Sequence, residues 1–427
     1  MSRILSSLSR GGRNSNEFRY AVWLLAAAAL TGLHSNGGAV AEDSAPSRPL
    51  VFDADPATGS AAAVLVGPVA LGHTAQIFPV DGNGKIPSAD SARGQIDAVF
   101  SNLERMLAPV SARWEDVVKL NVYAADVETV AEVRTALAEK FPGAAKPAVS
   151  FVVGTLARPD ARVALDAVIA CPTAEDGSVR RLRAKVGAGA TPAGSELAVL
   201  PPGPRVYISG QAEGGKDMAE ATQRTMESLK RTLAHLGHSL DDVVQVKSFL
   251  GPIGAVAEAE REIVKFFGGK NTPPLVFVEW SSSLPIEIEI VARGGVPTAR
   301  TAAAIEYLTP PGMTASPVFC RVTRVNAPET IYISGLFGKS NNNGARETQE
   351  IFDSLKTILR KTRSDFQHLA KATYYVSTEE ASTKLNEIRP KFYDPMRPPA
   401  ASKAMVAGTG LEGRTITLDM IAVRNPK

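Results

Sequence analysis

The hydrophobic positions of this chain repeat at a spacing of 126 residues, as Leu103, Leu229 and Leu355 illustrate. Four further sets keep this spacing without a gap: Phe100/Met226/Phe352, Leu107/Leu233/Leu359, Val117/Val243/Leu369 and Phe141/Phe267/Tyr393. Solenoid repeats have periods of about 20–50 residues, so a period this long indicates tandem domains. The pattern therefore predicts one domain that occurs three times, over residues 51–172, 180–293 and 302–425.

Each repeat has the same predicted order of strands and helices. It opens with strands such as 205–211, and a helix follows whose apolar residues recur at helical spacing, as Met226, Leu229 and Leu233 do. A strand, a second helix and two closing strands come next, and in the second repeat these strands are 243–249, 275–280 and 286–291. The order β-β-α-β-α-β-β predicts an α+β fold in which two helices cover one face of a sheet.

The uncovered face of this sheet also carries apolar residues. In the two closing strands of the second repeat, Val276, Val278, Ile288 and Ile290 occupy alternate positions. A sheet that is apolar on both faces needs a partner in addition to its helices. Three equivalent sheets meet this need by closing a ring, because a head-to-tail contact that closes leaves no surface unpaired. We therefore expect an intrachain pseudo-trimer, in which a monomer acts as a covalent trimer.

The first 41 residues have the pattern of a signal peptide. Four arginines precede an apolar run of about ten residues, 21–30, and Ala39-Val40-Ala41 offers the small residues that signal peptidase requires. The run is too short to cross a bilayer, which takes about 20 residues. We expect an exported protein, periplasmic or extracellular, that is not inserted in a membrane after cleavage. An uncleaved anchor is the alternative.

The charge balance gives no support for nucleic-acid binding. Of 47 basic and 44 acidic residues, four arginines and one glutamate lie in the leader, so the remainder carries no net charge. The one basic run, 180–185, lies near a repeat junction and is interpreted as a solvated linker. We therefore expect no nucleic-acid partner.

Neither the cysteines nor the histidines indicate a metal or a cofactor. Cys171 and Cys320 are too few for a disulfide framework, so they are either two buried thiols or a single bridge. The histidines have no metal-ligand spacing. The segment 408–413, Gly-Thr-Gly-Leu-Glu-Gly, has dinucleotide-binding spacing but precedes a terminal strand and opens no helix. We expect no cofactor and no metal.

The residues that resemble a known family are densest in the second repeat. They are Tyr207-Ile208-Ser209-Gly210-Gln211, Leu240 to Val246, Pro273-Pro274 and Leu284 to Ala292. The third repeat adds Ile331 to Gly335 and Leu418 to Val423, and the first adds Trp114 to Leu120. Over nearly the whole chain after the leader, this sequence resembles the Rid family (reactive intermediate deaminase, YjgF-like, also called endoribonuclease L-PSP). The resemblance implies a chorismate-mutase-like trimer with sheets inside, helices outside and a site at each interface.

The resemblance also implies a chemistry, the hydrolysis of enamines and imines derived from amino acids. In the family an arginine in a Pro-Ala-Arg-Ser-like motif grips the substrate carboxylate, which its planar fork binds bidentately. The corresponding positions here, again 126 residues apart, hold Val149, Leu275 and Ala401. Lys146 and Lys403 flank two of these positions and are possible substitutes. The resemblance thus predicts lost or altered chemistry.

The family also uses a glutamate in its last strand to position water. The acids that match this position in all three repeats are Asp166, Glu289 and Asp419, the candidate catalytic residues. The alternative is an ordinary half-solvated strand, because Glu287 and Glu289 alternate with isoleucines.

Three functions remain open. The first is a binding protein whose inter-repeat clefts hold a small neutral or aromatic ligand. The second is an active deaminase or hydrolase on 2-imino or enamine compounds. The third is a non-catalytic protein-interaction module.

Overall fold

Three successive segments of the chain contain the same series of elements. The structure is a computed structural model that describes residues 48–81, 83–86, 92–172, 177–183, 194–269, 271–295 and 303–425. These residues belong to one unit, Ala45–Lys427. The predicted signal peptide, 1–41, lies outside the described residues and stays a prediction.

The elements of the three segments are as follows. The first contains β1 (Leu50–Asp55), β2 (Ser60–Val66), β3 (Ala70–Thr74), α1 (Ala92–Leu107), β4 (Val117–Ala124), α2 (Val127–Lys140), β5 (Ala148–Val153) and β6 (Val163–Cys171). The second contains β7 (Arg180–Leu182), β8 (Leu197–Leu200), β9 (Arg205–Gln211), α3 (Met218–His235), β10 (Val243–Leu250), α4 (Val256–Phe266), β11 (Leu275–Glu279) and β12 (Ile286–Arg293). The third contains β13 (Ile305–Leu308), β14 (Val322–Val325), β15 (Thr330–Ile333), α5 (Gly344–Lys361), β16 (Leu369–Val376), α6 (Glu379–Ile388), β17 (Ala400–Met405) and β18 (Ile416–Val423). The mixed α+β fold is confirmed, with one more strand at the start of each segment than the sequence pattern predicts.

Short polar side chains start most of the helices. The carboxylates of Asp126 and Asp217 accept hydrogen bonds from backbone N–H groups in the first turns of α2 and α3. Asn343 and Thr378 do the same for α5 and α6. Each cap satisfies an N–H group that has no partner within the helix. The helices therefore begin at residues that the sequence specifies locally.

The first strands of each segment join the sheet of another segment. The strands form two sheets, of order β17-β16-β18-β15-β2-β5-β4-β6-β3-β8-β7, with β1 on β2, and β11-β10-β12-β9-β14-β13. Thus β8 pairs with β3, β14 pairs with β9, and β2 pairs with β15. A central five-strand unit, such as β11-β10-β12-β9-β14, therefore combines four strands of one segment with one strand of another.

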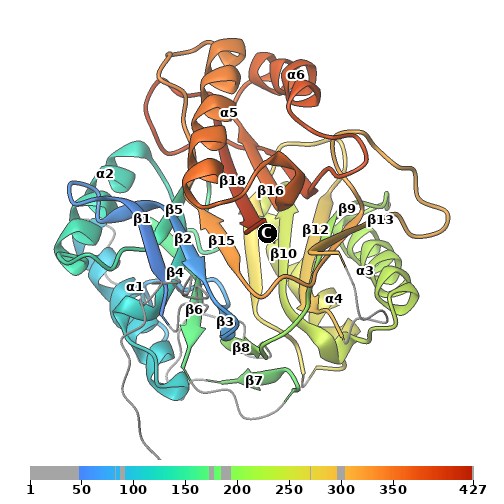
Figure 1. The fold of residues 1–427 in the computed structure, drawn as a ribbon. Helices are drawn as coiled ribbons and strands as arrows, with labels where there is room; N and C mark the ends of the chain where they lie inside the picture. Colours follow the sequence, from blue (N-terminus) through green and yellow to red (C-terminus); the bar gives the residue numbers. More distant parts are fainter. Residues whose placement is uncertain are drawn as a thin grey trace, which may run out of the picture. The chain divides into compact units, whose positions relative to one another are not determined.

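Each pair of helices covers one face of its own segment's strands. Figure 1 shows the pairs α1/α2, α3/α4 and α5/α6 on the outer side of the strands. Three separate apolar cores lie under them, around Leu103, Leu229 and Leu355. A fourth core joins strand residues from all three segments, including Val118, Val244 and Ala370. The inner faces of the strands thus bury one another. Val276 and Val278 lie outside the core under α3 and α4, as predicted, whereas Ile288 and Ile290 belong to that core, so their assignment to the uncovered face was wrong.

Two smaller expectations have clear outcomes. Cys171 and Cys320 are both free and buried. The basic run 180–185 is not a simple solvated linker, because residues 180–182 form β7 and Arg181 donates hydrogen bonds to the carbonyls of Asn271, Leu240 and Val243. Among the residues described, no helix is both long and apolar enough to span a membrane.

Candidate functional site

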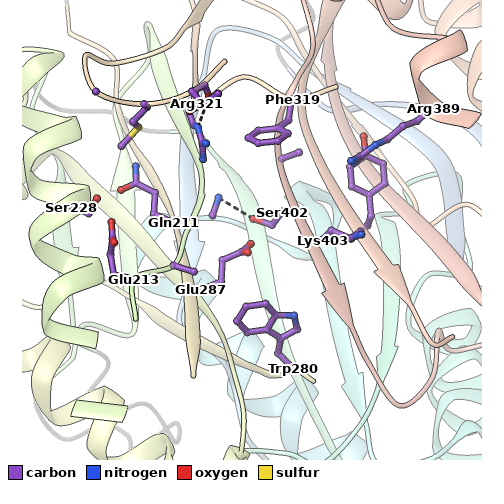
Figure 2. A pocket seen from close by; sticks show the side chains of 17 residues that line it. Gln211, Glu213, Ser228, Trp280, Glu287, Phe319, Arg321, Arg389, Ser402 and Lys403 are labelled. Carbon is purple, nitrogen blue, oxygen red and sulfur yellow. Dashed lines mark hydrogen bonds between the residues drawn. The ribbon is translucent and has the colours of Figure 1, made fainter. Parts of the chain in front are cut away.

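A cavity of about 630 Å³ lies between strands of the second and third segments. The second segment contributes the end of β9, with Gly210 and Gln211, and Glu287 from β12. The third contributes Ala401, Ser402 and Lys403 from β17, together with the loop before β14. Figure 2 shows the polar and aromatic side chains that surround the cavity. Its volume falls in the range that small-molecule sites occupy, about 300–1,000 Å³.

Glu287 reaches the cavity because of the alternation along β12. Ile286, Ile288 and Ile290 face the core beneath the helices, so Glu287 and Glu289 share the opposite face. Gly210 makes room for the carboxylate, since a Cβ at this position would lie 1.9 Å from Oε1 of Glu287. Burial, together with the nearby Glu289 carboxylate, raises the pKa of Glu287 to about 7. This side chain can therefore exchange a proton near neutral pH.

Three cationic side chains face the same cavity, namely Arg321, Arg389 and Lys403. Lys403 Nζ donates a hydrogen bond to Ser382 Oγ at 2.9 Å, and burial together with Arg389 lowers the pKa of Lys403. Arg389 lies over the ring of Tyr374, at 5.2 Å from its centroid. Arg321 Nε donates a hydrogen bond to the carbonyl of Thr314 at 3.1 Å. The cavity therefore carries positive charge in addition to the aromatic side chains that a neutral or aromatic ligand would contact.

The three positions predicted to have lost an arginine lie at contacts between segments. The N–H of Ala401 donates to Ser209 Oγ at 2.7 Å, and the N–H of Val149 donates to Ser334 Oγ at 2.7 Å. The carbonyl of Leu275 accepts from the N–H of Gln76 at 2.9 Å. Of the three, only Ala401 lines the cavity that contains Glu287. Ala401 is thus the position at which an arginine would share a cavity with that glutamate.

The candidate catalytic acids line a different cavity. Asp166, Glu289 and Asp419 lie around a smaller space enclosed by strands of all three segments. Each is paired with a lysine of another segment: Lys247 with Asp166 at 3.5 Å, Lys371 with Glu289 at 2.9 Å, and Lys119 with Asp419 at 3.1 Å. The structure therefore does not bring these three acids to the cavity around Ala401.

Glu289, and not Glu287, matches the family's last-strand acid, and its position is acidic in all three repeats. The strand pairings place Glu287 opposite Phe249, whereas the residues at the equivalent positions, Ala164 and Thr417, lie opposite Tyr123 and Tyr375. The acid that reaches the cavity thus occurs in one repeat only. A pattern shared by three repeats cannot reveal a residue that two of them lack.

The two lysines considered as substitutes have different locations. Lys403 lines the cavity, whereas Lys146 is buried and donates a hydrogen bond to the carbonyl of Phe141. Between the first and second segments the space is only about 10 Å³. There Phe277 occupies the position of Lys403, and Glu279 Oε2 accepts a hydrogen bond from the N–H of Thr155 at 2.6 Å. Of these two spaces, only the one around Glu287 has room for a ligand.

Comparison with known proteins supports the resemblance to the Rid family. The model of the endoribonuclease L-PSP family matches residues 64–171 and 193–293. Both matches lie within the predicted repeats 51–172 and 180–293, so the chain contains two Rid-like domains by sequence. No curated protein matches this sequence.

Several solved structures are similar to parts of the chain. A member of the YjgF/YER057c/UK114 family from Mycobacterium tuberculosis is 24% identical, covering 27% of this chain and 99% of its own, with a TM-score of 0.21. A YjgF family member from Neisseria meningitidis is 18% identical, covering 29% and 97%, with a TM-score of 0.22. TdcF from E. coli, solved with bound serine, is 21% identical, covering 21% and 80%, with a TM-score of 0.20.

Proposed function

We propose that this chain is a tandem triplication of a Rid-like domain that closes on itself as a pseudo-trimer and is monomeric in solution. Two observations support this proposal. Each segment gives its first strands to the sheet of another, in a cyclic order that includes the first and last segments. The three buried lysine–carboxylate pairs follow a cyclic order as well. Light scattering on the purified chain tests the proposal, and an obligate assembly of three whole chains would refute it.

We propose that the cavity around Glu287 binds a small ligand with an anionic group, and that the imine chemistry of the family is lost or altered. The observation that carries this proposal is that the cationic side chains of the cavity stand at other positions than the family's arginine. An alanine stands where the resemblance expects the arginine, while Arg321, Arg389 and Lys403 face the same cavity from other positions. These three cations attract an anionic group into the cavity, but none of them stands at the position from which the family's arginine binds the substrate carboxylate.

Binding of small carboxylates provides the test, because a ligand that binds only the folded state raises the melting temperature. We expect a monocarboxylate such as pyruvate or benzoate to raise the melting temperature of the wild type. The shift should shrink in Arg321→Met and Lys403→Met, and persist in Arg93→Met, which changes an exposed arginine far from the cavity lining. Equal shifts in all four proteins, or none in the wild type, would contradict an anion site in this cavity.

One observation favours a second candidate, an active hydrolase. Glu287 has a pKa of about 7, near the value that suits a general acid or base at neutral pH. In this case wild-type protein would release ammonia from 2-iminopropionate with a rate that follows one group titrating near pH 7. Glu287→Gln would abolish both the rate and its pH dependence. Absence of ammonia release above the uncatalysed rate would eliminate this candidate.

We assign a structural role to Asp166, Glu289 and Asp419. A buried carboxylate that is paired with a lysine of another segment stabilises the contact between the two segments, and its removal leaves the lysine buried without a counter-charge. The first prediction in the Discussion tests this role.

A further inference from the structure

The cavity that contains the three acids is lined by equivalent strand positions from the three segments. Its volume is about 50 Å³. Its lining residues form five sets of three: His73/Tyr207/Tyr332, Lys119/Gln245/Lys371, Asn121/Lys247/Thr373, Asp166/Glu289/Asp419 and Val168/Val291/Ile421. We call this space the axial cavity. It shares no lining residue with the larger cavity around Glu287, although the two adjoin where Ser402 Oγ, which lines the larger cavity, donates a hydrogen bond to Glu289 at 2.7 Å.

The charges that line the axial cavity cancel. Each of the three lysines faces one of the three carboxylates, and all six side chains are buried or nearly so. Further hydrogen bonds hold the carboxylates, such as those from Asn121 Nδ2 and Tyr123 Oη to Asp166. Burial lowers the pKa of Lys119, and the Asp419 carboxylate opposes this shift. These groups are therefore satisfied by one another and do not require a ligand.

One end of the axial cavity contains polar groups that are not satisfied. His73, Tyr207 and Tyr332 occupy equivalent positions, paired with Val168, Val291 and Ile421 on the neighbouring strands. Both ring nitrogens of His73 are buried without a hydrogen-bond partner among the residues that the structure describes, and the hydroxyls of Tyr207 and Tyr332 have no partner there other than each other and Arg205. All three side chains are at least 97% buried. Unsatisfied groups of this kind are rare in folded proteins and require an explanation.

A buried arginine lies beside these three side chains. Arg205 is two residues before Tyr207 in β9, so both point to the same face of the strand. It is 4% exposed, its Nε has no hydrogen-bond partner, and no carboxylate in the described part of the chain forms an ion pair with it. Thr330, which precedes Tyr332 by two residues in β15, also has an unpartnered hydroxyl. Arg205 is not a lining residue of the cavity, but it acts electrostatically on His73 and Tyr332, which are, so its positive charge lies next to this end of the cavity.

His73 does not add a second charge. Burial lowers the pKa of His73 to about 3, and the neighbouring Arg205 and Lys247 contribute to the shift. The imidazole is therefore neutral at physiological pH and offers one N–H donor. Together with two tyrosine hydroxyls and the arginine Nε–H, it surrounds this end of the cavity with hydrogen-bond donors.

We propose that the axial cavity binds one small monovalent anion, of the size of chloride, between His73, Tyr207, Tyr332 and Arg205. A single negative charge compensates the one unpaired cation, since an unpaired charge in a protein interior is costly. The size follows from the volume, because a water molecule needs about 10–15 Å³ by this measure. A cavity of about 50 Å³ therefore admits an ion or a few waters, but excludes the larger ligands proposed for the cavity around Glu287.

Anomalous diffraction from crystals grown in bromide instead of chloride tests the proposal directly. We expect an anomalous peak within hydrogen-bond distance of Tyr207 Oη and Tyr332 Oη, and ordinary density for chloride at the same place. Ordered waters in both crystals with no anomalous signal would overturn the proposal, because water alone would then satisfy the buried groups.

A stability measurement provides a second, independent test. At constant ionic strength, replacing gluconate with chloride should raise the melting temperature by about 2 °C for each tenfold rise in chloride above its dissociation constant. Gluconate serves as the reference because it is too large for the cavity. The chloride effect should vanish in Arg205→Met. It should weaken in Tyr332→Phe, which keeps the aromatic ring and its packing and therefore provides the test if Arg205→Met does not fold. The control Arg93→Met should keep the full rise in melting temperature with chloride. The proposal would be refuted if the control lost this rise as Arg205→Met does, or if chloride had no effect on the wild type.

Discussion

Lys371→Met removes the cation that faces Glu289 in the interior and is expected to lower the free energy of unfolding by about 3–5 kcal/mol. Lys371 Nζ lies 2.9 Å from the Glu289 carboxylate, and the two side chains are 10% and 4% exposed. Methionine keeps the length of the side chain but supplies no charge, so Glu289 is left buried opposite an apolar group. Ser402 Oγ continues to donate its hydrogen bond to Glu289, which places the cost toward the lower end of this range.

Urea unfolding of matched variants provides the measurement, with the slope m checked for constancy so that the midpoint reports stability. The double variant Lys371→Met/Glu289→Met should recover most of the loss, because it removes both charges. The control is Arg93→Met, which breaks exposed ion pairs with Asp97 and Glu139 and should cost much less, because exposed pairs are screened by solvent. A loss below about 1 kcal/mol for Lys371→Met, or no recovery in the double variant, would refute the reasoning that these pairs hold the segments together.

Two further predictions concern Glu287. Gly210→Ala places a Cβ 1.9 Å from Glu287 Oε1 and should destabilise the protein by about 1–3 kcal/mol. The control is Gly254→Ala, whose Cβ meets nothing within 4 Å and which should cost less. Thermal unfolding of both variants measures the difference. The pKa of Glu287 is raised from 4.5 to about 7 in the folded protein, so the folded protein binds this proton more tightly than the unfolded chain does. The contribution of this proton to stability is therefore full below pH 4.5 and is lost as the pH rises through 7. Unfolding curves at pH 4.5 and pH 8 should therefore show a smaller loss of stability in Glu287→Gln than in the wild type, and parallel losses would contradict the raised pKa.

The secondary structure could be predicted from the sequence because local signals specify it. The 126-residue spacing of apolar residues located the helices, and the strand predicted at 243–249 agrees with β10 within one residue. Capping residues such as Asp126 and Asp217 mark the starts of helices without any tertiary information. The exchange of the first strands between segments was not predicted, since β8 can satisfy its backbone equally well on either of two sheets. Only tertiary packing decides between them.

The candidate site was predicted less completely, for two physical reasons. Glu287 and Glu289 share one face of β12, and alternation alone cannot tell which of them meets a cavity and which meets a lysine. The cations of the cavity also come from positions far apart in the chain, such as Arg321 and Arg389, and no sequence spacing links them. The position of Ala401 was accessible from the sequence, because it follows from the register of the repeats.

Hydrolysis of 2-iminopropionate by the wild type and by Ala401→Arg tests the central claim most directly. The missing member of a buried charge pair is worth about 3–5 kcal/mol, which corresponds to a rate factor of about 100 or more. We predict no ammonia release above the uncatalysed rate from the wild type, and measurable release from Ala401→Arg, whose new side chain shares the cavity with Glu287. Leu275→Arg is the control, because Ala164 occupies the position equivalent to Glu287 at that contact, and it should remain inactive. Rapid turnover by the wild type would contradict the claim that the imine chemistry of the Rid family is lost or altered in this chain.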